Sequence, residues 1–185
     1  MKAITLKALQ EMRKRGFDES VIAAQYDLNR SELAQQLLVQ IQNAFKDVTL
    51  GNGVGLYQAQ ALDDYRTKDE EAAARFNDEK SDWSKISSQQ LNQCNSSLSF
   101  FDPEGMRFHL PAYLTAELNG EYGFGMAFCL TFLEYGDSNF QLLSGPQRLA
   151  IRNFLEFLRD DADYEYERSN IIEALESYWT EASCH

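Results

Sequence analysis

Helix-start signals recur along this chain and constrain its fold more than any other feature. A capping residue followed three positions later by Glu or Gln satisfies free backbone N–H groups at the start of a helix, and Pro fits the first helical turn. Such signals occur at 29–32, 67–70, 87–90, 102–103 and 144–146. Alternation of apolar and polar residues between turn residues, which is typical of strands, is scarce. The sequence therefore predicts an all-α or nearly all-α fold.

Amphipathic runs give the approximate positions of the helices. A first helix with apolar residues from Ile4 to Met12 on one face ends at Gly16. A short helix over 19–25 and a turn at 26–29 precede a long helix that begins at residue 29. The apolar stretch 122–135 is predicted to be a buried helix, with a pair of short strands as the alternative. Further helices are predicted over 57–65, 67–76, a short stretch from 87, 102–118 with a kink or break near Pro111, 144–159 and 164–179.

A length of 185 residues fits a single domain. We expect an N-terminal helical extension over residues 1–30 and one compact multi-helix domain over residues 31–185. No apolar run reaches the roughly 18 residues that a membrane span needs, and no charged start leads into an apolar signal core. The odd number of cysteines, three, is typical of a reducing compartment. We therefore expect a cytoplasmic protein without membrane association.

Charge is distributed unevenly along the chain. The formal net charge is −12. Residues 1–30 contain six Lys and Arg against four Asp and Glu, a net +2, so the remaining residues carry −14. The stretch 160–181 contains eight acidic residues and only Arg168 to offset them. This pattern indicates either a solvated face or an acidic surface for a basic partner protein, and it disfavours binding to nucleic acid or anionic lipid.

Several motifs that would assign chemistry are absent or incomplete. The glycines of 51–55 read G-x-G-x-G after a predicted helix end, whereas the dinucleotide-binding pattern is G-x-G-x-x-G after a strand. We interpret them as a flexible connector. The acids at 161, 163 and 165 have calcium-loop spacing, but Tyr166 and Ile172 stand where that loop needs Gly and Glu. With two histidines and no C-x-x-C or H-E-x-x-H, we expect no metal site and no cofactor.

Asp63 and Asp64 suggest an acidic site. Adjacent acids on a helix point about 100° apart, so both cannot face the same core. They are then solvated or paired with an arginine such as Arg107. Alternatively, they form a paired-carboxylate metal or acid–base site together with Asp102 and Glu104 from another helix.

His109 is the one histidine away from the C-terminus, so any Ser–His–Asp or Cys–His arrangement would have to use it. No G-x-S-x-G nucleophile motif is present. We therefore interpret His109 as a packed, hydrogen-bonded histidine. Tyr178 and Trp179 either pack internally or form a contact between two copies of the chain.

Three stretches carry a family resemblance: YQAQALDDY at 57–65, WSKI at 83–86 and SFFDPEGMRFHLPAY at 99–113. They resemble an uncharacterised bacterial family known as a domain of unknown function, with a signature of the type SFFDPEGxRFxLPAY. The resemblance covers about residues 31–160, and the ends look like additions. It implies no activity or cofactor, and the family usually has Tyr or a similar residue where this chain has His109. It directs attention to Asp63, Asp64, Tyr65, Trp83, Asp102, Glu104, Arg107 and Tyr113.

Three functional hypotheses remain. The leading one is a non-catalytic cytoplasmic binding protein, immunity- or adaptor-like, with an acidic surface for a basic partner; a homodimer is compatible with it. The second is a small enzyme with a carboxylate–arginine site of Asp63, Asp64, Glu104 and Arg107, dependent on a divalent metal in one version, with His109 as a further catalytic candidate. The third is DNA binding through a helix-turn-helix-like segment at 17–40. Independently of these hypotheses, the candidate binding residues are Tyr65, Trp83, Asp102 and Tyr113.

Overall fold

The computed structural model describes residues 6–132 and 138–184, and these residues contain helices and no strand. The all-α prediction is confirmed. The helices are α1 (Leu6–Lys14), α2 (Glu19–Phe45), α3 (Leu56–Asp63), α4 (Lys68–Asn77), α5 (Ser88–Gln93), α6 (Pro103–Leu118), α7 (Ala127–Thr131), α8 (Gly145–Arg159) and α9 (Arg168–Ser177). Short 3-10 helices cover Trp83–Lys85, Asn95–Ser99, Ala162–Tyr164 and Glu181–Cys184.

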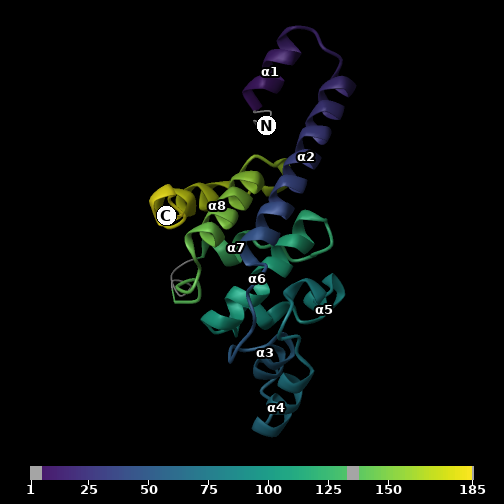
Figure 1. The fold of residues 1–185 in the computed structure, drawn as a ribbon. Coiled ribbons are helices and arrows are strands. Elements are labelled where there is room, and N and C mark those ends of the chain that lie inside the picture. Colours follow the sequence, from purple (N-terminus) through teal and green to yellow (C-terminus); the bar gives the residue numbers. More distant parts are fainter. Residues whose placement is uncertain (1–5, 133–137, 185) are drawn as a thin grey trace.

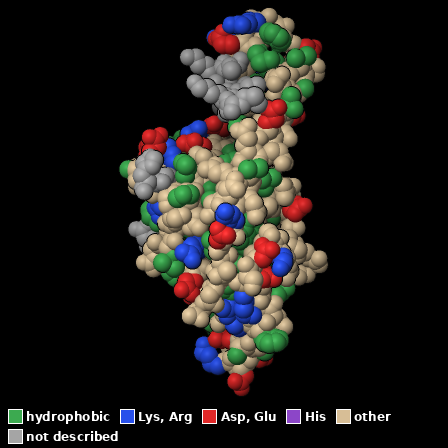
Figure 2. Space-filling view, viewed as in Figure 1, with side chains coloured by type: hydrophobic (Ala, Val, Ile, Leu, Met, Phe, Trp, Pro, Cys, Tyr) green, Lys and Arg blue, Asp and Glu red, His purple; other side chains and the backbone are tan. Residues whose placement is uncertain are grey.

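The molecule is elongated, with a body around α6 and α8 and projections at both ends (Figure 1). At one end, α1 folds back beside the first half of α2 to form a projecting arm. The second half of α2 packs against α6 and α8 in the body. At the other end, α3 and α4 pack together as a pair. Hydrophobic side chains gather on the arm in Figure 2, where Phe17, Val21 and Leu28 are about half exposed.

One hydrophobic core joins most elements of the body. Its largest fully buried side chains come from α2, α6, α8, the segment before α8 and the segment after α9: Phe45, Phe108, Tyr113, Phe154, Phe140 and Trp179. The Trp179 indole N–H donates to the Leu130 carbonyl at 2.8 Å. Trp179 therefore packs internally, which was one of the two alternatives for it. No helix within the described ranges has both the length and the apolar character that a membrane crossing requires.

Four of the five helix-start predictions are confirmed. The capping boxes at Thr67, Ser87 and Ser144 form in front of α4, α5 and α8. The Asp102 carboxylate accepts the Gly105 N–H at 2.8 Å in front of α6, where Pro103 is the first residue. Gly16 ends the first helix with a φ of +78°, a conformation that glycine adopts without strain. Ile4, predicted in that helix, lies outside the described residues.

The turn predicted at 26–29 is wrong, because α2 runs unbroken from Glu19 to Phe45. Its N-cap is Asp18, and the helix contains no Gly or Pro that would break it. Tertiary contacts fix the segment as helix: Asn29 is buried, and the Tyr26 hydroxyl donates to the Asp160 carbonyl at 3.1 Å. The helix-turn-helix hypothesis therefore lacks the turn on which it was based.

Two further predictions need correction. Within the described part of the stretch 122–135, the only α-helix is α7, because Gly125 takes a positive φ angle directly before its N-cap. Residues 133–137 of that prediction lie outside the described residues. No break occurs at Pro111 either, since α6 continues through it to Leu118.

The glycines of 51–55 are a tightly packed junction, so their interpretation as a flexible connector is wrong. A Cβ at Gly53 would lie 2.5 Å from the backbone nitrogen of Gly105, and one at Gly55 would lie 1.8 Å from Asp78 Oδ2. The Val54 N–H also donates to Asp102 at 2.9 Å. The lack of side chains at these glycines lets the loop lie directly against the start of α6.

Candidate functional site

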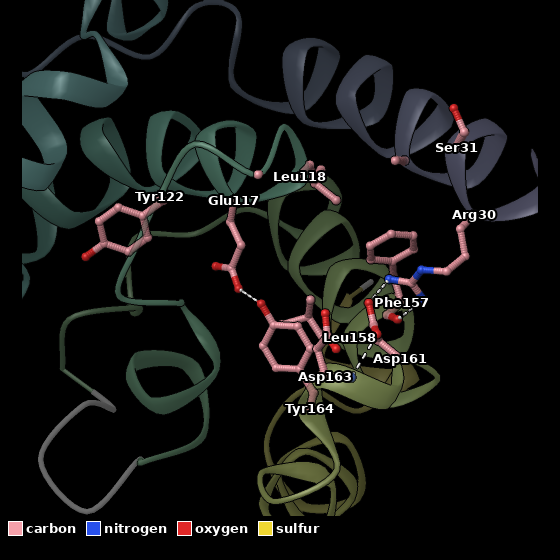
Figure 3. A pocket seen from close by; sticks show the side chains of 12 residues that line it. Arg30, Ser31, Glu117, Leu118, Tyr122, Phe157, Leu158, Asp161, Asp163 and Tyr164 are labelled. Carbon is pink, nitrogen blue, oxygen red and sulfur yellow. Dashed lines mark hydrogen bonds and ion pairs between the residues drawn. The ribbon is translucent and has the colours of Figure 1, made fainter. Parts of the chain in front are cut away.

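A pocket of about 390 Å³ lies between α2, the end of α6, the end of α8 and the 3-10 helix Ala162–Tyr164. Figure 3 shows Glu117 entering it from α6 and Arg30 approaching from α2 on the other side. Three carboxylates and three aromatic rings line this Glu117 pocket: Glu117, Asp161, Asp163, Tyr122, Phe157 and Tyr164.

Glu117 is a partly buried carboxylate held by neutral donors. The backbone N–H of Met126 donates to its Oε2 at 2.6 Å, and the Tyr164 hydroxyl donates to its Oε1 in a short hydrogen bond. No ion pair within the described ranges involves Glu117. Burial raises the pKa of this carboxyl above its ordinary value, and the two hydrogen bonds only partly oppose that effect. The fold thus places an acid in a position with little solvation and no opposite charge.

The two tyrosines that line the pocket with Glu117 are neutral at physiological pH. Burial raises the pKa of Tyr122 to about 12. Burial, followed by the hydrogen bond to the Glu117 carboxylate, raises the pKa of Tyr164 well above its ordinary value. Both phenols therefore keep their protons, and Tyr164 remains the donor in its bond to Glu117.

Arg30 joins the arm to the pocket through three kinds of contact. Its guanidinium nitrogen Nη2 lies 2.5 Å from Asp161 Oδ2, and Nη1 donates to the Phe157 carbonyl at 3.3 Å. Its Cζ lies 3.9 Å from the centroid of the Phe157 ring, which is cation–π geometry. The exposed fractions of the Arg30 and Asp161 side chains are 17% and 21%, so the ion pair is only weakly screened by solvent.

The pocket opens beside a cluster of acids, Asp160, Asp161, Asp163, Glu165 and Glu167, which we call the acidic corner. Asp160 pairs with Arg159, and Asp161 pairs with Arg30. The other three form no ion pair with any residue that the structure describes. The neighbouring Arg168 donates to the carbonyls of Arg159 and Asp161 instead. The ring of Tyr166, 93% exposed, lies within this acidic stretch.

The acids at the end of α3 do not pair as predicted. Asp64 forms an ion pair with Arg66 at 3.6 Å, and Asp63 forms none with the described residues. Arg107 donates instead to the Leu142 carbonyl at 3.5 Å, so the predicted pair between Arg107 and these acids is wrong. The nearby Tyr65 has a φ of +55° and a side chain that is 96% exposed.

The remaining sequence candidates have packing contacts. Trp83 is buried, and its indole N–H donates to the Phe45 carbonyl at 2.9 Å. His109 is buried, stacks on Phe101 at 4.4 Å between ring centroids, and contacts the Gly105 carbonyl through Nδ1 at 2.7 Å. Tyr113 is buried against the edge of the same Phe101 ring.

Asp102 and Glu104 complete this set. The Asp102 carboxylate accepts hydrogen bonds from the backbone N–H groups of Val54 and Gly105. Glu104 is partly exposed beside the glycine junction, 3.6 Å from the Cβ position of Gly51. No hydrogen bond or ion pair of the described residues links Glu104 or Arg107 to Asp63 or Asp64. The structure thus brings His109 and Tyr113 together around Phe101, but it does not join the four charged candidates.

The described residues offer no cluster of metal ligands, and Cys94 and Cys129 are not reactive thiols. Among the described residues, no three His, Cys, Asp or Glu side chains converge as a metal site would require. Cys94 and Cys129 are free thiols, and burial raises their pKa values to about 11 and about 12. They are therefore protonated and poorly nucleophilic at neutral pH.

Glu117 is a site residue that was not predicted from the sequence. Leu110, Tyr113 and Leu114 precede it by seven, four and three positions, which places an acid on the buried stripe of a helix. An acid on the buried side of a predicted helix is the sequence signal that could have identified Glu117. Its partner Tyr164 and the opposing Arg30 are far away in the sequence, so no local pattern relates them.

Fold and site together define an all-α protein with a polar, aromatic-lined pocket beside an acidic surface. The sequence model of the family described as "Family of unknown function (DUF6714)" matches residues 33–183, and the chain belongs to that family. The match continues past residue 160 and includes the acidic corner, so the C-terminal end is not an addition. Arg30 precedes the matched range. No curated protein and no solved structure matches the chain.

Proposed function

We propose that this protein is a non-catalytic binding protein whose acidic corner docks a basic partner protein. The observation that carries the proposal is the set of three acids, Asp163, Glu165 and Glu167, that lack cationic partners among the described residues. They are close together in the sequence, on both sides of the exposed Tyr166. Complementary charge steers association and selects partners, and an exposed tyrosine supplies contact area at low entropic cost.

The rest of the molecule is consistent with this role. The formal net charge of −12 attracts a basic partner over a distance that salt limits. Free thiols at Cys94 and Cys129 fit the cytoplasmic location that belongs to this proposal. The corner contacts the end of α8 through Arg159 and the middle of α2 through Arg30, so it is supported without neutralising all of its acids.

The test is a titration of a labelled peptide of alternating arginine and serine, followed by fluorescence anisotropy. We expect binding that weakens steeply between ~50 and ~500 mM salt, since the screening length of exposed charges falls from about 14 Å to about 4 Å over this range. The variant Asp163→Asn/Glu165→Gln is expected to weaken binding about fivefold at low salt.

The control variant Asp63→Asn/Asp69→Asn makes the same change in net charge at the α3–α4 end of the molecule, far from the corner (Figure 1). Neither of these acids forms an ion pair with the described residues. We expect the control to change the affinity less than about twofold. Equal effects of the two variants would show that only overall charge matters, and the assignment to the acidic corner would be wrong.

A further inference from the structure

The Glu117 carboxylate can bind a positively charged group in addition to its two neutral hydrogen-bond donors. A carboxylate removed from water is costly unless an opposite charge or several strong donors compensate it. Its partners here are a tyrosine hydroxyl and one backbone N–H, which are both neutral. Each carboxylate oxygen can accept more than one hydrogen bond. The carboxylate therefore lacks a cation in a place where a cation would be strongly bound.

The same pocket already holds one guanidinium group, which shows what its walls bind. Arg30 combines an aromatic face from Phe157, a carboxylate from Asp161 and the Phe157 carbonyl. On the Glu117 side, the pocket again combines a carboxylate with aromatic side chains: Glu117 is flanked by Tyr122 and by Tyr164, whose hydroxyl group faces the carboxylate. The volume of about 390 Å³ is within the range of small-ligand pockets, roughly 300–1,000 Å³.

We propose that the Glu117 pocket receives an arginine side chain of the basic partner, whose guanidinium pairs with Glu117 beside Tyr164. This inference rests on the proposed function, since the arginine belongs to the protein that docks on the acidic corner. Asp163 lines both the pocket and the corner, so a side chain that enters the pocket leaves its own backbone at the acidic surface.

Arginine fits these walls better than lysine does. The guanidinium is planar, donates to both oxygens of a carboxylate and stacks on aromatic faces, whereas an ammonium is a more strongly hydrated point charge. A site with one carboxylate and two rings therefore discriminates between the two side chains even though their charge is equal. The acids of the open corner do not discriminate in this way, because they act through charge in solvent.

The experiment compares two peptides of equal length and charge, one alternating arginine with serine and the other lysine with serine. We expect the wild-type protein to bind the arginine peptide at least about fivefold more tightly. Glu117→Gln should bring the ratio of the two affinities close to one. Asp163→Asn/Glu165→Gln should weaken both peptides and preserve a ratio above one, because Glu117 is intact in that variant.

Two controls keep the result interpretable. Glu121→Gln makes the same charge change four residues away at an exposed position, and it should leave the ratio unchanged. Glutamine keeps an acceptor for the Met126 N–H, so the fold should tolerate Glu117→Gln. Because burial raises the pKa of Glu117, the native state disfavours the ionised carboxylate, and the variant should melt at the same or a higher temperature at pH 8.

Agmatine, a free guanidinium compound, tests the pocket without any partner. We expect it to shift the aromatic NMR signals of Tyr122 and Tyr164 in the wild-type protein and not in Glu117→Gln. Two outcomes would show that the arginine pocket is wrong while the acidic-corner proposal stands. In the first, the wild-type protein binds both peptides with similar affinity. In the second, its preference for the arginine peptide is unchanged in Glu117→Gln. If neither peptide binds, the proposed function fails, and a missing agmatine shift would reject the pocket as well.

Discussion

His109 makes the stability of this protein depend on pH. Its ring is fully buried, stacks on Phe101, and has no hydrogen-bond partner for Nε2 among the described residues. Burial lowers the pKa of His109 to about 4. Between the unfolded value near 6.5 and this value, the unfolded chain binds a proton that the native state excludes, so the free energy of unfolding falls as the pH falls.

The variant His109→Phe keeps the aromatic stack and removes the titrating group. We expect the wild type to lose about 2 kcal/mol more than the variant in the free energy of unfolding between pH 7.5 and pH 5. Urea titrations at the two pH values measure this difference. Parallel losses in the two proteins would mean that His109 is protonated in the native state.

At the scale of the elements, the start of α3 and the end of α4 are joined by contacts that a single methyl group would disrupt. Asp78 accepts the Tyr57 N–H at 2.7 Å at the start of α3, and Gly55 leaves the space that this carboxylate occupies. We expect Gly55→Ala to lower the free energy of unfolding by about 2 kcal/mol, since overpacking displaces a buried capping group. The comparison is Gly123→Ala, whose Cβ would approach nothing closer than Asn92 Oδ1 at 3.4 Å. Urea unfolding measures the free energy of unfolding of both variants. If both lose a similar amount, the close contact between Gly55 and Asp78 does not explain the effect.

Some helix starts of this protein could be predicted from the sequence, and others could not. Helix starts at Thr67, Ser87 and Asp102 were predictable because capping uses side chains within three residues of the start. The same pattern at 29–32 gave a wrong start, because contacts of Tyr26 with a segment more than 100 residues away keep α2 helical there. The Glu117 pocket was not predicted for a similar reason. It brings together α2, α6 and the residues after α8, and only tertiary packing determines that meeting.

For the molecule as a whole, we expect Arg30 to be important for the attachment of the projecting arm to the body. Tyr26 and Arg30 connect the first half of α2 to Phe157, Asp160 and Asp161, and Figure 1 shows α2 leaving the body beyond this point. Arg30→Met keeps an apolar stem on Phe157 but leaves Asp161 without its cation. We expect the amides of residues 19–32 to exchange with deuterium about tenfold faster, while those of α6 and α8 stay protected, because local opening depends on local contacts.

Arg15→Met is the matched control for this prediction. Arg15 is exposed on the arm and forms no ion pair with the described residues. Its replacement removes one positive charge from the same projection and should leave exchange unchanged. Faster exchange throughout α6 and α8 in Arg30→Met would show that the arm and the body unfold together. In that case Arg30 would support the whole fold, and the arm would not be an independently opening segment.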